Sequence, residues 1–232
     1  MGRMADSPQN TSWSNRLTAV LQFLALGKAG IALRSILEIL EIAEQVRDRL
    51  GYHGMFEVLS YDATLEIKDA TGDEATLTRR ETIRFLQDNV VALHDHAWGN
   101  GELFAEYHCR PGVPVDFYED GSKHNVLISL RETKNRGDVM DLWIERVVRG
   151  GLATPPWWLE TEIEHWTRNL KLSIIFPKER LCRHATITRR IAERTVPLGD
   201  QHFAFLRDGR QQVTWQAKHP KLHDVHTIKW DW

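Results

Sequence analysis

The amino-acid sequence predicts a mainly β fold, in which one long N-terminal α-helix precedes an antiparallel β-sandwich. Apolar residues recur every three or four positions over residues 16–50, which is typical of a helix. From residue 55 onward they recur every two positions, which is typical of half-buried strands. Turn residues follow about every ten positions, as they do in all-β sandwiches and barrels, so a barrel is the alternative architecture.

The composition is that of a globular protein. The chain has 232 residues, of which 42% are hydrophobic and 27% charged, and its formal net charge is -2 at pH 7. Disordered chains are less apolar and carry more net charge. The length predicts one large domain with an appendage. We divide the chain into a flexible leader (1–15), a long amphipathic helix (16–53) and a β-sandwich domain (54–232).

The predicted helix carries a heptad-like apolar seam. Ala, Ile, Val or Leu occupies positions 25, 29, 32, 36, 39, 43, 46 and 50, and Gly51 stands where a left-handed C-terminal cap belongs. Neighbouring leucines widen this face beyond what one partner usually covers. We expect the helix to pack on its own domain or to associate with a second helix, with Ile36, Ile39 and Val46 in the interface.

Residues 17–33 are the most apolar stretch of the chain. The stretch contains Gln22 and Lys28 and is shorter than the roughly 20 apolar residues that span a membrane. The apolar period also continues beyond it to Leu50, so we expect neither a spanning helix nor a signal peptide. Insertion of residues 17–33 into a membrane is kept as an alternative function.

The second part of the chain predicts a series of strands separated by Gly, Pro, Asn and Asp. A long hairpin of residues 55–69 and 74–86 comes first, joined by the turn at 70–73. No alternation of strands with helices is seen, so a parallel α/β sheet is not expected. The remaining predicted strands are 90–94, 103–109, 125–132, 139–148, 158–166, 170–176, 184–190, 202–206, 212–217 and 225–231.

The best chemical lead is the tripeptide His94-Asp95-His96. Residues i and i+2 of a strand point to the same side, so both imidazoles can meet one metal ion. With Glu102 and the later His124, the order of residue types resembles part of the cupin pattern, in which His and Glu side chains of a small β-barrel bind one metal. The resemblance covers residues 90–125; the spacing from His96 to Glu102 is longer than the family's, and its Pro-x-Gly motif is missing. It implies a transition metal on His94, His96 and Glu102, and a metal-dependent enzyme as an alternative function.

Other catalytic signatures are absent from the sequence. The chain has no G-x-S-x-G elbow, no Walker A loop, no G-x-G-x-x-G and no paired C-x-x-C motifs. Cys109 and Cys182 are too few for a disulfide framework, and we expect both as free thiols in the cytoplasm. The sequence therefore favours a protein without enzymatic activity and without a bound cofactor.

Charge is distributed unevenly along the chain. Residues 168–232 hold 13 Lys and Arg against 6 Asp and Glu (+7), whereas residues 1–167 hold 17 against 26 (-9). We expect the basic part to pair with the acidic part, within one protomer or between two. A nucleic-acid interface is the alternative, with contacts from Arg183, Arg189, Arg190 and Arg194.

Tryptophan gives the last interface signal. Trp157 and Trp158 are adjacent on a predicted strand, so they cannot both point inward, and we expect one of them to contact a partner. Together the observations predict an interaction, sensor or accessory module that binds itself or another protein through its N-terminal helix.

Overall fold

The computed structural model describes residues 54–232, which form one compact unit. The predicted leader (1–15) and the predicted helix (16–53) lie outside the described residues. The same is true of Ile36, Ile39, Val46 and the apolar stretch 17–33. Within residues 54–232, no helix is long and apolar enough to cross a membrane.

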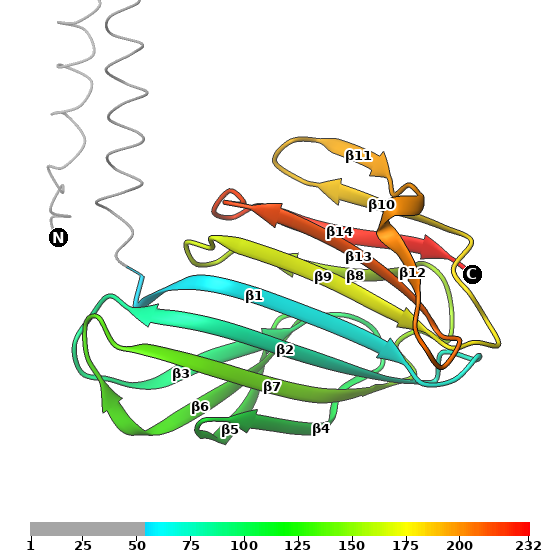
Figure 1. The fold of residues 1–232 in the computed structure, drawn as a ribbon. Helices are drawn as coiled ribbons and strands as arrows, with labels where there is room; N and C mark the ends of the chain where they lie inside the picture. Colours follow the sequence, from blue (N-terminus) through cyan, green and yellow to red (C-terminus); the bar gives the residue numbers. More distant parts are fainter. Residues whose placement is uncertain (1–53) are drawn as a thin grey trace, which may run out of the picture. The chain divides into compact units, whose positions relative to one another are not determined.

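The described residues are mainly strands (Figure 1). Twelve of the fourteen strands coincide with predicted ones, because the alternation of apolar and polar residues marks them. In chain order the elements are β1 (Phe56–Ile67), β2 (Glu74–Phe85), β3 (Val90–Ala97), β4 (Glu102–Arg110), β5 (Val113–Asp120), β6 (Lys123–Lys134), β7 (Val139–Arg149), β8 (Trp157–Glu162), β9 (Asn169–Phe176), β10 (His184–Arg189), β11 (Arg194–Pro197), the 3₁₀ turn η1 (Asp200–His202), β12 (Phe203–Phe205), β13 (Gln211–Lys218) and β14 (Val225–Asp231).

Strands β5 and β11 were not predicted from the sequence. Strand β5 begins Val-Pro-Val-Asp, and its last six residues are all exposed, so no buried face imposes a period of two. Strand β11 has only four residues, none of them buried. Both lie at the edges of their sheets, where the backbone pairing on one side is sufficient to define a strand.

The strands form three sheets arranged as a sandwich and not as one closed barrel. A seven-stranded sheet has the order β12-β13-β9-β1-β2-β7-β4, a four-stranded sheet has the order β11-β10-β14-β8, and a three-stranded sheet has the order β3-β6-β5. The predicted antiparallel arrangement is wrong at one pair, because β1 and β9 run parallel. These two strands are far apart in sequence, so no hairpin turn constrains their direction.

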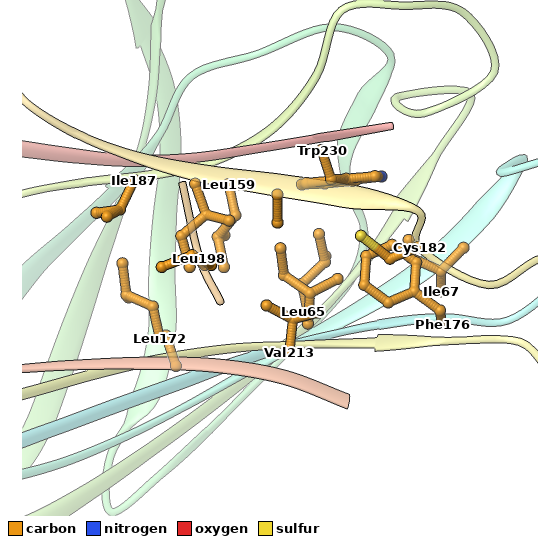
Figure 2. Packing of buried hydrophobic residues seen from close by; sticks show 14 of the residues in the cluster. Leu65, Ile67, Leu159, Leu172, Phe176, Cys182, Ile187, Leu198, Val213 and Trp230 are labelled. Carbon is orange, nitrogen blue, oxygen red and sulfur yellow. The ribbon is translucent and has the colours of Figure 1, made fainter. Parts of the chain in front are cut away.

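Two hydrophobic cores lie between the layers. The first joins β1, β2, β9 and β13 to the four-stranded sheet, and includes Leu172, Phe176 and Trp230 (Figure 2). The second joins the other ends of β1 and β2, together with β7, to the three-stranded sheet, and includes Phe85 and Ile128. Strands β1 and β2 therefore run beneath both smaller sheets, and their middle residues lie where the two cores meet.

Candidate functional site

Charged side chains lie on the inward face of the sandwich, where the two cores meet. Arg79 and Glu81 follow Ala75 and Leu77 at every second position of β2 and precede Ile83 and Phe85. Because alternate residues of a strand share a face, both charges point inward. Asp95 likewise lies on the inward face of β3, between the buried Leu93 and Ala97.

Arg79 is the centre of this buried charge cluster. Its Nη1 atom lies 2.7 Å from Oδ1 of Asp95, and its Nε atom lies 2.7 Å from Oε1 of Glu81. The side chain of Asp95 is only 2% exposed and that of Glu81 8%. The hydroxyl of Tyr107 donates a hydrogen bond of 2.8 Å to the second oxygen of Asp95. One guanidinium thus faces two carboxylates inside the protein.

Arg146 on β7 supplies the second positive charge. It lies on the same side of its strand as the buried Ile144 and donates from Nη1 to the backbone oxygen of His96 at 3.4 Å. Its guanidinium also stacks over Phe104, 5.6 Å from the ring centroid. Two arginines therefore balance the two carboxylates, and the cluster is formally neutral.

The two carboxyl groups respond to this environment in opposite directions. Burial by itself raises the pKa of Asp95, but attraction to Arg79 and Arg146 and the hydrogen bond from Tyr107 bring the pKa below its usual value. Burial also raises the pKa of Glu81, and there the single contact with Arg79 does not reverse the effect. Burial and the nearby Asp95 raise the pKa of the Tyr107 hydroxyl. The cluster thus contains one firmly ionised carboxylate and one carboxyl group that binds a proton more readily.

Arg79, Glu81, Asp95 and Arg146 line a cavity of about 100 Å³ between β1, β2, β3 and β8. Typical small-molecule sites measure about 300–1,000 Å³. The cavity has room for several water molecules. The ion pairs of the cluster join strands of different sheets and so help to hold the layers in register.

A row of four rings includes three that line the cavity, those of His94, His96 and Trp98. Tyr118, His94, His96 and Trp98 follow one another with centroid separations of 6.2, 5.9 and 5.3 Å. Nε2 of His96 lies 3.5 Å from Oε1 of Glu164. Burial, followed by the charge of Lys123, lowers the pKa of His96 from 6.5 to about 4, so this imidazole is neutral at pH 7.

The predicted metal ligands are only partly brought together. His94 and His96 lie side by side, but Nε2 of His94 is 3.0 Å from the amide oxygen of Asn125. Glu102 is an exposed residue at the start of β4, in a different sheet, and its register partner is Arg149. Nδ1 of His124 lies 3.3 Å from Oε1 of Glu119, on the neighbouring strand. Within residues 54–232 no three His, Cys, Asp or Glu side chains converge as metal ligands, and the metal site stays a prediction.

The two cysteines are both buried and free. The expectation of free thiols is confirmed, because neither takes part in a disulfide. Burial raises the pKa of the Cys182 thiol to about 12, and that of Cys109 is raised for the same reason. Neither thiol has the depressed pKa that a nucleophilic cysteine needs.

A second feature is the surface of strand β5, which we call the β5 surface and define as residues 115–120. All six of its residues are exposed, and three of them are the large side chains Val115, Phe117 and Tyr118. The exposed Leu127 on the neighbouring strand adjoins them. In the described part of the chain β5 pairs only with β6, so its other edge has free backbone groups.

The tryptophans predicted as contacts lie elsewhere and are partly buried. Trp157 packs on the first core, 5.9 Å from the ring of Trp232, and its indole N–H donates to the backbone oxygen of Leu152 at 3.0 Å. Trp158 lines a small cavity of about 80 Å³ beside Leu103. The adjacent tryptophans do occupy opposite faces. Three of the ten exposed large apolar side chains of the described residues lie instead on β5, a strand that was not predicted from the sequence.

The four arginines predicted to bind nucleic acid do not form one patch. Arg189 and Arg194 are directly opposite each other on β10 and β11, and Arg190 is the first residue of the connecting turn. Arg183 lies just before the other end of β10. The structure therefore gathers three of the four at one hairpin tip.

Comparison with known proteins gives only remote likenesses. No family model matches the sequence, and no curated protein matches it. Among solved structures, the M1 zinc metallopeptidase of Deinococcus radiodurans is similar at 10% identity, with a TM-score of 0.45. A mutant of that enzyme bound to a Tyr-Ser-Ala substrate gives the same values. The match covers 75% of this chain and 42% of the metallopeptidase, so the chain spans less than half of that protein's length. A likeness this remote is no basis for assigning a family or an activity.

Proposed function

We propose that the protein is a non-enzymatic interaction module whose described domain presents the β5 surface to a partner. One observation carries this proposal: six consecutive exposed residues, rich in large apolar side chains, lie on the open edge of a sheet. Exposed apolar groups that gather on one strand mark interaction sites, whereas scattered ones do not. An open edge also offers backbone hydrogen bonds to an added strand.

The central cavity is lined by the charged side chains of the buried cluster. Its charged residues contact each other and hold strands of both layers, so they serve the scaffold beneath the three-stranded sheet. The association of the predicted helix through Ile36, Ile39 and Val46 remains part of the proposal. It places a second contact outside the described residues.

A matched pair of substitutions tests the β5 surface. Val115 on β5 and Val91 on β3 are 54% and 56% exposed and lie on opposite edge strands of the same three-stranded sheet. In the full chain, Val115→Lys is expected to weaken association at least tenfold by sedimentation velocity, because a Lys side chain opposes burial of this surface. Val91→Lys is expected to leave association unchanged.

Two outcomes contradict the proposal. A full chain that stays monomeric throughout a concentration series has no self-association for the β5 surface to mediate. If the Val115→Lys and Val91→Lys variants associate equally strongly, the contact lies elsewhere, and the segment 16–50 is the next candidate. Metal analysis of the same purified protein tests the alternative, since a stoichiometric metal lost in His96→Ala favours the metal-dependent enzyme.

A further inference from the structure

The hairpin β10–β11 carries the opposite charge to the β5 surface. We define the basic hairpin as residues 184–197; at its tip stand Arg189, Arg190 and Arg194, with Glu193 as the single acidic residue. None of the three arginines forms an ion pair with another described residue. The expected pairing of the basic part with the acidic part is made elsewhere, by Arg168 with Glu57, Lys171 with Asp62 and Arg210 with Glu66. Within residues 54–232 it is not made by this hairpin.

The centre of the hairpin tip is apolar. Ile191 is 47% exposed and stands between the arginines. The backbone N–H of Arg190 donates to the oxygen of Val225 at 3.0 Å, and the N–H of Ile191 donates to the carboxylate of Asp224 at 2.8 Å. These bonds fix the turn against β14, so little conformational freedom is lost when the tip binds a partner.

The β5 surface has the same arrangement with the signs reversed. Its apolar residues Val115 and Tyr118 are interspersed with Asp116, Glu119 and Asp120. Glu119 lies 3.3 Å from His124, whereas Asp116 and Asp120 form no ion pair with a described residue. Because successive strand residues alternate faces, Asp116 and Asp120 flank Tyr118 on one face of β5, whereas Phe117 and Glu119 lie on the other. A tyrosine flanked by two carboxylates complements an exposed isoleucine flanked by guanidinium groups.

The two surfaces cannot meet within one domain. Strand β5 contacts β6 and β4, and β11 contacts β10, with no closer approach between the two edges. In Figure 1, β11 lies at the top of the view and β5 near the bottom, with the strands of the seven-stranded sheet between them. Within residues 54–232 the two surfaces therefore do not pair with each other, and a second copy of the chain supplies a matching surface for each.

We propose that the β5 surface of one copy binds the basic hairpin of a second copy. This inference rests on the proposed function and names its partner. The contact is head-to-tail, because it joins two different surfaces, and its repetition gives a ring or an open chain of copies. Opposite charges steer the encounter, while the apolar centres of the two surfaces are buried on contact.

Complementary charge reversal tests the inference in the full chain. The acid-reversed variant carries Asp116→Lys, Glu119→Lys and Asp120→Lys, and the base-reversed variant carries Arg189→Glu, Arg190→Glu and Arg194→Glu. Each alone places like charges together, so each is expected to associate at least tenfold more weakly than the wild type. A 1:1 mixture restores opposite charges at both contacts, and its association is expected to recover.

A control and a second measurement accompany the mixture. Arg207→Glu, Lys218→Glu and Lys221→Glu reverse the same number of basic charges at exposed positions elsewhere and are expected to have no effect. Wild-type association is expected to weaken as salt rises from about 0.1 M to about 1 M, because the screening length falls from about 10 Å to about 3 Å. Circular dichroism confirms that each variant is folded.

The outcomes separate this inference from the proposed function. If Val115→Lys abolishes association but the base-reversed variant still associates, the β5 surface binds something other than the hairpin, and only the inference fails. If both reversed variants are monomeric and their mixture does not recover, the predicted pairing is also wrong. If the wild-type chain is monomeric, both proposals fail.

Discussion

Removing the charge of Asp95 should be the most damaging conservative substitution in the domain. Asp95→Asn keeps the size of the side chain and an oxygen that accepts from Tyr107, but it deletes the negative charge 2.7 Å from Arg79. The side chain is 2% exposed, so water does not replace the lost partner. Breaking a buried ion pair by removing one partner costs about 3–5 kcal/mol.

Urea unfolding of the full chain measures this cost. Eight of the nine tryptophans lie in residues 54–232, so tryptophan fluorescence follows mainly this domain. With a urea slope of about 2 kcal/mol per M, a cost of about 4 kcal/mol lowers the unfolding midpoint by about 2 M. Asp141→Asn is the control, because Asp141 is exposed and accepts one hydrogen bond from Thr82 at 2.7 Å. Its expected cost is at most about 1 kcal/mol.

The pH dependence of the same variant checks the cause. The pKa of Asp95 is lowered from 3.8 in the folded protein, so its stabilising charge is fully present above that value and is lost as pH falls through the lower folded pKa. The difference between wild type and Asp95→Asn should stay constant from pH 7 to about 4 and shrink below it. A cost at pH 7 equal to that of the Asp141→Asn control would refute the reasoning that the cluster holds the layers together.

Three further predictions concern other parts of the domain. Phe176→Ala should lower the free energy of unfolding by about 3–5 kcal/mol in urea titrations, because the ring is fully buried in the first core and its removal leaves a cavity. A decrease of less than about 1 kcal/mol would contradict this packing. Gly101→Ala should lower the melting temperature more than Gly137→Ala does. Both glycines have a positive φ, so both substitutions strain the backbone. A Cβ atom at position 101 would also lie 2.3 Å from the backbone oxygen of Arg149, whereas a Cβ atom at position 137 would have no atom within 4 Å. Stability should fall as pH decreases from 6.5 towards 4, because the pKa of His96 is lowered from 6.5 to about 4 and the unfolded chain binds a proton that the folded chain does not. His96→Gln should make the melting temperature less dependent on pH over that range, and an unchanged dependence would show that His96 is not a source of it.

The charged cluster shows how a signal present in the sequence can be missed. Arg79 and Glu81 occupy the positions of β2 that the alternation assigns to the buried face, between Leu77 and Ile83. That alternation was sufficient to predict the strand, and the two charges on its apolar face were themselves a signal of a buried polar site. Their partner Asp95 comes from a different sheet, however, and the distance between the two residues depends on how the layers stack.

The sequence by itself determined the strands whose apolar residues alternate and the turns between them. These features are local, since a period of two and a turn residue act over a few positions. The tertiary structure decided the division into three sheets, the parallel pairing of β1 with β9, and the separation of Glu102 from His94 and His96. It also decided that β5 and β11 are exposed edges of opposite charge. Those features depend on contacts between residues far apart in the chain, and a strand's own residues do not specify which strand will lie beside it.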